Sequence, residues 1–333
     1  MTDLALIWAG VLTLAVLLYV IMDGFDLGIG IVFPMLEVGD DRDRAMNSIA
    51  PVWDGNETWL VLGGGGLFAA FPLAYGVLMT AFYAPLTAML LGLVFRGVAF
   101  EFRWRDPDHR ALWDFSFTAG SLLAAFCQGL ILGAFVQGIE VDNRSYGGGW
   151  FDWLTPFSVM TGVAVSVGYA LLGSGWLIMK SDGALRQRAY QVALPLAVGM
   201  LALIGTVSLW TPMLSQEIAD RWFSSENLLR LWPIPLLVAV LAILLLEGLR
   251  KQRDWWPFSA TLGLFLASYA GLAVSLFPYV VPRSLTIWDA AAPDSSLRFL
   301  LIGTVILLPM ILAYTGYAYW VFRGKLKAGE GYH

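Results

Sequence analysis

Histidine and cysteine are nearly missing from this 333-residue sequence. There are two histidines, His109 in a charged loop and His333 at the last position, and one cysteine, Cys127, inside an apolar run. No histidine therefore lies in an apolar segment, so we expect no histidine ligand for a haem or a metal ion within the membrane. A single cysteine also excludes a disulfide or an iron–sulfur cluster held by this chain alone.

Charged residues are also scarce. They make up 14% of the chain, against 58% hydrophobic residues, and the mean hydropathy is +0.70. Soluble domains carry roughly 25% charged residues, so this composition predicts an all-α polytopic membrane protein surrounded by the lipid bilayer. The net charge of −5 gives no indication of a nucleic-acid partner.

Apolar segments long enough to cross a bilayer recur along the whole chain. They predict nine transmembrane helices within a single integral membrane domain, residues 1–333. The expected helices span about 4–33, 50–73, 76–100, 114–138, 154–179, 191–212, 231–249, 257–280 and 298–322. Only the short stretch 72–76 separates the second helix from the third.

The positions of lysine and arginine predict the orientation. With nine helices, 15 of the 20 basic residues fall in alternate connections on one side, among them Arg42, Arg103, Lys180, Arg253 and Lys327. Basic residues accumulate on the cytoplasmic side of membrane proteins. We therefore expect the N-terminus outside, in the periplasm, and the C-terminus in the cytoplasm.

Four acids occur in or beside these apolar segments. Asp23 and Asp26 lie three residues apart near the end of the first helix, and Asp54 and Glu57 lie three residues apart at the start of the second. The predicted topology brings them to the cytoplasmic half of the membrane, at a depth similar to that of Arg96 in the third helix.

Such groups are expensive in a membrane unless they pair, carry a proton or face water. Burial raises the pKa of a carboxyl group, whereas a nearby arginine lowers it, so a carboxyl group subject to both effects is suited to taking up and releasing protons. We expect this role for Asp54 and Glu57, because no basic residue lies within two turns of them along the chain. For Asp26 and Arg96 a purely structural ion pair is an equal alternative. The run Gly63–Gly66 behind the acids predicts close approach of a neighbouring helix.

Several motifs resemble subunit II of the cytochrome bd-type quinol oxidases, in the order found in that family. They are MDGFDLGIG, SIAPVWDGNETW, FPLAYG, FRGVAFEFR and SLTIWDA, and they span nearly the whole chain. The start and the short length look closest to the cyanide-insensitive branch. The resemblance implies two four-helix bundles plus one peripheral helix, packed against a similarly folded subunit I.

The same resemblance implies a division of labour with that partner. Subunit I would carry the haems, oxidise quinol and reduce oxygen, and a small single-helix subunit is a further candidate partner. The family's proton pathway from the cytoplasm includes the aspartate of the WDG motif, here Asp54. Asp26 and Arg96 match family residues that line the pathway or support it, and Asp23 and Glu57 are further pathway candidates. Whether this chain binds a quinone stays open.

The sequence thus predicts subunit II of a quinol:oxygen oxidoreductase in the bacterial inner membrane, with no oxidase activity of its own. Two alternatives are a proton-coupled secondary transporter and a pure scaffold. A transporter could use Asp26 and Asp54 as coupling acids, but such proteins tend to contain internal repeats, and none is visible here.

Overall fold

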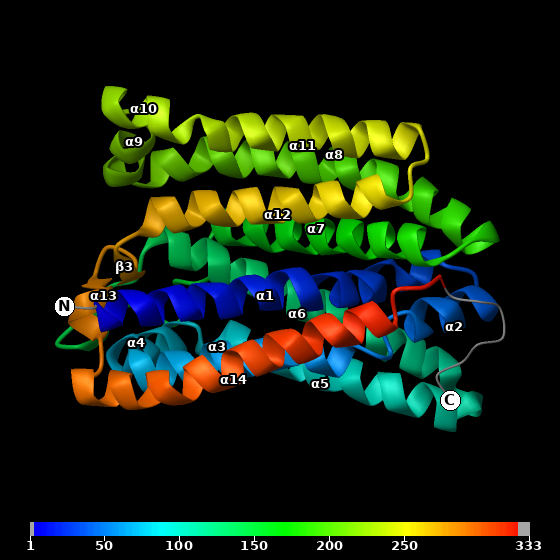
Figure 1. Ribbon diagram of the computed structural model, residues 1–333, viewed down its shortest axis with the longest axis horizontal. Coiled ribbons are helices and arrows are strands. Elements are labelled where there is room, and N and C mark those ends of the chain that lie inside the picture. The colour runs from blue at the N-terminus through cyan, green and yellow to red at the C-terminus, as the bar shows by residue number, and fades with distance from the viewer. Residues whose placement is uncertain (1–2, 326–333) are drawn as a thin grey trace.

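The computed structural model describes residues 3–325, so Lys327 and His333 lie outside the described residues. Nearly all of the chain is helical, and the long helices run side by side along the long axis of the molecule (Figure 1). The long helices are α1 (Leu4–Val32), α3 (Trp53–Ala70), α5 (Tyr83–Arg105), α6 (Arg110–Gln137), α7 (Pro156–Lys180), α8 (Gly183–Leu214), α11 (Pro233–Arg250), α12 (Trp255–Leu276) and α14 (Asp294–Val321).

Short elements connect the long helices at their two ends. The helices are η1 (Phe33–Met35), α2 (Asp40–Asn47), α4 (Pro72–Ala81), η2 (Pro107–His109), α9 (Gln216–Phe223), α10 (Ser225–Leu231) and α13 (Ile287–Ala290). The strands form two antiparallel pairs, β1 (Val141–Asp142) with β2 (Ser145–Tyr146), and β3 (Tyr279–Val281) with β4 (Leu285–Thr286).

Eight helices of the described chain are long and apolar enough to cross a membrane. They overlap eight of the nine segments expected from the sequence. The ninth expected segment corresponds to α3, whose first two turns are polar and which is not among the eight.

The expected helix 76–100 is wrong at its start. Its first residues belong to α4, and a new helix, α5, begins at Tyr83 after a break at Phe82. Pro85 explains the break, because proline has no backbone N–H and its ring clashes with the carbonyl group four residues earlier. Three other helices begin at least four residues earlier than expected, α6 at Arg110, α8 at Gly183 and α14 at Asp294.

The packing divides the long helices into two groups. In the first group α1 packs against α3 and α6, and α6 packs against α5. In the second, α7 packs against α8 and α12, and α11 packs against α8 and α12. Helix α7 joins the two groups through α1 and α6. Helix α14 lies outside both groups, alongside α1 and α3 (Figure 1).

Glycines bring the central helices together. A Cβ atom on Gly28 of α1 would overlap the backbone of Tyr169 in α7, and one on Gly173 would overlap the backbone of Gly28. Gly92 of α5 and Gly120 of α6 face each other in the same way, since a Cβ on Gly92 would lie 2.8 Å from the Gly120 carbonyl oxygen. These contacts fix how α1, α5, α6 and α7 are rotated about their axes, and so which side chains meet between them.

Candidate functional site

The candidate site begins with two aspartates of α1. Asp23 and Asp26 are three residues apart and therefore share one face of the helix, and both are completely buried. The adjoining residues Gly24 and Gly28 let α7 pack directly against this part of α1. The two carboxyl groups are thus enclosed by protein and not by lipid.

Arg96 of α5 is the cation of this cluster. Its Nη1 atom lies 2.9 Å from an oxygen of Asp23 and 2.6 Å from an oxygen of Glu57, and its Nη2 atom lies 3.8 Å from Asp26. The guanidinium group is completely buried and lies 5.9 Å from the ring of Trp53. The expected pairing of Asp26 with Arg96 is therefore the longest of three contacts, and the two short ones go to Asp23 and Glu57.

Glu57 differs from its expected surroundings. The sequence offered no basic residue near it along α3, but Arg96 reaches it from α5. Its side chain stays 26% exposed, whereas those of Asp23 and Asp26 are enclosed. Glu57 is therefore the member of the cluster that joins it to the molecular surface.

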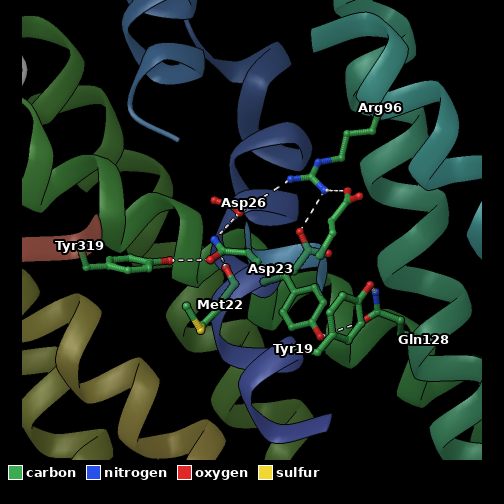
Figure 2. A network of polar contacts seen from close by, with 10 residues as sticks. Tyr19, Met22, Asp23, Asp26, Arg96, Gln128 and Tyr319 are labelled. Carbon is green, nitrogen blue, oxygen red and sulfur yellow. Dashed lines mark hydrogen bonds and ion pairs between the residues drawn. The ribbon is translucent and has the colours of Figure 1, made fainter. Parts of the chain in front are cut away.

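Asp26 is bound from its other side by Asn56. The Nδ2 group of Asn56 donates to Asp26 at 2.7 Å, and the Tyr319 hydroxyl of α14 donates to Asn56 Oδ1 at 2.9 Å. Figure 2 shows Arg96 and Tyr319 approaching the two aspartates from opposite sides. Sequence reasoning missed both Asn56 and Tyr319, although an asparagine between Asp54 and Glu57 was a visible signal.

A second set of polar side chains lies one turn from Asp23. Gln128 of α6 donates to the Tyr19 hydroxyl at 2.8 Å and accepts from the Tyr169 hydroxyl at 2.7 Å. Tyr19 lies four residues before Asp23 on α1, hence on the same face. Polar groups therefore continue from the acid cluster toward α6 and α7 (Figure 2).

Asp54 does not join the cluster. It is exposed and has no hydrogen bond or ion pair with any residue in the range 3–325. It lies in the first turn of α3, where the helix dipole favours a negative charge. The exposed stripe of α3, defined here as Asp54, Thr58, Val61, Gly65 and Phe68, follows the helical repeat along one face.

The four-glycine run lies on this helix. A Cβ atom on Gly66 would contact Leu12 of α1 at 2.7 Å, but Cβ atoms on Gly64 and Gly65 would meet nothing within 4 Å. The expected close approach of a helix thus concerns Gly66 within this chain, while Gly64 and Gly65 leave room beside α3.

A separate charged cluster closes the end of α5 and was not expected from the sequence. Asp114 of α6 accepts from Arg103 at 2.5 Å and from Arg42 at 2.7 Å, and Arg103 also reaches Asp43 at 2.7 Å. Arg103 follows Arg96 by seven residues and so lies on the same face of α5, two turns away. The sequence analysis placed Arg42 and Arg103 in connections between helices, because the short helix α2 and the early start of α6 were not foreseen.

The described residues offer little to a metal ion or a haem. Among residues 3–325 no group of three or more histidine, cysteine, aspartate or glutamate side chains could hold a metal. His109 is exposed, lies outside the apolar helices and contacts Asp106 at 3.0 Å. His109 is the only histidine among residues 3–325, and it lies in the short helix η2 (Pro107–His109), just before α6.

The fold and the site together define a class of protein. The chain is a multi-pass helical membrane protein in which one buried arginine contacts two enclosed aspartates and a partly exposed glutamate between its helices. The family model for cytochrome bd terminal oxidase subunit II matches residues 4–322, and the chain belongs to this family.

Individual relatives agree. The chain is 32% identical to cytochrome bd-I ubiquinol oxidase subunit 2 of Escherichia coli K12, covering 97% of this chain and 95% of that one. It is 30% identical to cytochrome bd ubiquinol oxidase subunit 2 of Bacillus subtilis 168, covering 93% of each. The fold is similar to a chain in the structure of the bd oxidase from Geobacillus thermodenitrificans, with a TM-score of 0.74 at 18% identity and 96% of this chain covered.

This membership settles the general function. The chain is a subunit of a respiratory bd-type quinol oxidase, an oxidoreductase complex whose subunit I is its implied partner, and its place is the bacterial inner membrane. The complex carries haems. The transporter alternative finds no support among these relatives.

Proposed function

We propose that this chain conducts protons from the cytoplasm toward the oxygen-reducing site of its partner subunit. The observation that carries the proposal is that Asp23, Asp26 and Glu57 share a single guanidinium group, that of Arg96. Three ionised carboxylates beside one arginine would leave a formal charge of −2 in a cluster of which only Glu57 is partly exposed. Burying uncompensated charge is costly, so protons are the simplest means of balancing it.

The arrangement supports a route with an outer and an inner part. Glu57 is partly exposed and shares Arg96 Nη1 with the enclosed Asp23. A proton that reaches Glu57 can pass to Asp23 around this nitrogen, with the arginine stabilising whichever carboxylate is ionised. Tyr19, Gln128 and Asn56 then offer further hydroxyl and amide groups on either side.

Asp54 completes the proposal as the group that faces the partner. It stands on the exposed stripe of α3, one turn from Glu57, and is the only charged residue of that stripe. A carboxyl group in such a place needs a polar neighbour or water. We infer that subunit I covers the stripe and that Asp54 lies at the point where protons cross between the subunits.

The finer architecture is part of the same proposal. We count α3 as the ninth transmembrane helix, the two packed groups as the two four-helix bundles, and α14 as the peripheral helix. All of it forms a single integral membrane domain. The distribution of basic residues supports a periplasmic N-terminus and a cytoplasmic C-terminus.

The chain's relation to cofactors follows from its residues. We propose that subunit I ligates all the haems and oxidises quinol, so this chain alone has no oxidase activity. Binding of a quinone or of a small single-helix subunit by this chain has no supporting contact in the described residues, and we propose neither.

Substitution of Asp54 in the complete oxidase tests the proposal. We expect Asp54→Asn and Asp26→Asn to slow quinol-driven oxygen uptake at least tenfold, with the haem spectrum unchanged. Asp294→Asn, an exposed acid at the other end of the molecule, is the control and should leave the rate intact. Wild-type oxygen uptake and proton translocation in both Asp54→Asn and Asp26→Asn would support the pure scaffold instead.

A further inference from the structure

Helix α14 is attached to the rest of the chain mainly at its ends. Leu297 is its only buried residue among those described. Near one end, Trp8 donates to the Leu297 carbonyl oxygen at 3.1 Å. At the other, Lys180 of α7 donates to the carbonyl oxygens of Phe322 and Gly324, which closes the C-terminal end of the helix.

The second attachment places Tyr319 against the acid cluster. Its ring packs edge-on against Phe25 and Trp176, with centroids 6.4 and 6.2 Å away, and Lys180 lies 4.9 Å from the Trp176 ring. Its hydroxyl group extends to Asn56, which is 99% buried. A residue from a loosely packed helix thus reaches the interior of the molecule (Figure 2).

The contacts of Asn56 fix the orientation of its amide group. The Met22 carbonyl oxygen can only accept a hydrogen bond, and it faces Nδ2 at 3.4 Å, so the NH2 group must point toward Met22 and Asp26. Oδ1 then points away from Asp26 and accepts from Tyr319. In this orientation Asn56 presents a donor to Asp26, which favours the ionised carboxylate.

Removal of the Tyr319 hydroxyl would leave Oδ1 buried without a donor. An unsatisfied buried acceptor is costly, and the nearby donor that could replace the tyrosine is the hydroxyl group of a protonated Asp26. Once Asp26 is protonated, only the long 3.4 Å contact with the Met22 carbonyl oxygen opposes turning the amide over, so Oδ1 can turn to accept from Asp26. The tyrosine therefore decides which protonation state of Asp26 the asparagine supports.

We propose that Tyr319 is a positioning residue that acts through Asn56 to hold Asp26 in its proton-releasing form. The proposal rests on the proposed role of the acid cluster in proton conduction. The other charged groups that interact with Asp26 are Asp23 from α1, Glu57 from α3 and Arg96 from α5. Tyr19 from α1 and Tyr169 from α7 interact with Asp23. None of them contacts Tyr319 by a hydrogen bond, so a change at Tyr319 reaches Asp26 through Asn56.

The test is an infrared pH titration of the complete oxidase, following the C=O stretch of protonated carboxyl groups. The band that disappears in Asp26→Asn reports Asp26. In Tyr319→Phe, which keeps the aromatic packing, we expect this band to persist to a pH roughly one unit higher than in the wild type. Tyr317→Phe is the matched control, since Tyr317 is exposed on the same helix and makes no hydrogen bond within residues 3–325. In this variant the Asp26 band should have the same pH dependence as in the wild type.

Asn56→Leu provides an independent check should Tyr319→Phe assemble poorly. It should shift the Asp26 band in the same direction, and adding Tyr319→Phe should shift it no further. An unchanged titration in Tyr319→Phe, an additive shift in the double variant, or no Asp26 band at any pH in either protein would overturn the proposal.

The titration requires no turnover, so it is separate from the oxygen-uptake test of Asp54→Asn and Asp26→Asn. A shifted band with wild-type turnover in those two variants would keep the positioning role and remove the proton route. An unshifted Asp26 band in Tyr319→Phe, with slow turnover in Asp54→Asn and Asp26→Asn, would keep the proton route and remove the positioning role.

Discussion

Arg96 and Glu57 form the shortest contact of the acid cluster, 2.6 Å between Nη1 and Oε1. They belong to α5 and α3, two helices that the short helix α4 separates in the sequence. The same nitrogen lies 2.9 Å from Asp23. One atom therefore ties α5 to both α1 and α3, so Arg96 has a structural role in addition to any role in proton movement.

We predict that Arg96→Met destabilises the oxidase by roughly 3–5 kcal/mol, because it leaves buried carboxylates without a counter-charge. Thermal unfolding of the detergent-solubilised complex measures the effect. Asp23→Asn and Glu57→Gln added to Arg96→Met should recover part of the loss, since they remove the unpaired charges. Arg105→Met, at an exposed position, should unfold like the wild type; a loss as large as that of Arg96→Met would count against this explanation.

We predict that Gly28→Ala prevents assembly. The added methyl group would overlap the Tyr169 backbone, and α1 would have to move away from α7, at a cost of at least about 3 kcal/mol. The yield of membrane-inserted protein in size-exclusion chromatography measures this. Gly10→Ala in the same helix has open space around it and should give normal yield. Normal yield for Gly28→Ala would mean that the two helices are less closely packed than described.

The exposed stripe of α3 leads to a prediction about the partner. Gly65→Phe places a large ring where the added Cβ atom meets nothing in this chain, so the subunit itself should fold. We expect at least a tenfold loss of co-purified haem, because subunit I can no longer lie close to α3. Gly205→Phe, on an equally open part of α8, should retain haem. Equal haem in the two variants would place the partner elsewhere.

The end of α14 should respond to acid through Asp254, which lies between α11 and α12. Burial would raise the pKa of Asp254, but hydrogen bonds from Arg186, Tyr190 and Lys325 outweigh it and hold that pKa below its usual value. A lowered folded-state pKa stabilises the protein above the unfolded-state pKa, and the stabilisation is lost as the pH falls through the folded-state value.

We therefore predict that Asp254→Asn lowers thermal stability by about 1 kcal/mol or less from pH 8 down to pH 5. The difference from the wild type should shrink once the pH falls below about 4, the usual pKa of an aspartate, and vanish only below the still lower folded-state pKa. Melting curves at each pH provide the comparison, with Asp108→Asn, an exposed acid without an ion pair among residues 3–325, as the control. A difference that grows toward acid pH would contradict this sign.

The architecture could largely be predicted from the sequence because its cause is local. A run of about 20 apolar residues must form a helix in a bilayer, whichever helices surround it. The expected segments therefore overlap the observed helices along the chain. The break at Phe82 was missed although Pro85 was visible, because apolar composition continues across it and hides the local effect of the proline.

The sequence by itself also determined that Asp23, Asp26, Glu57 and Arg96 lie among apolar segments and must be compensated there. Only the tertiary structure decided that Arg96 binds Asp23 and Glu57 more closely than Asp26, that Asp54 faces outward, and that Tyr319 reaches Asn56. The reason is that contacts between helices depend on how each helix is rotated about its own axis. That rotation is fixed by close backbone contacts such as Gly28 with Gly173, between residues too far apart in the chain for spacing or periodicity to connect them.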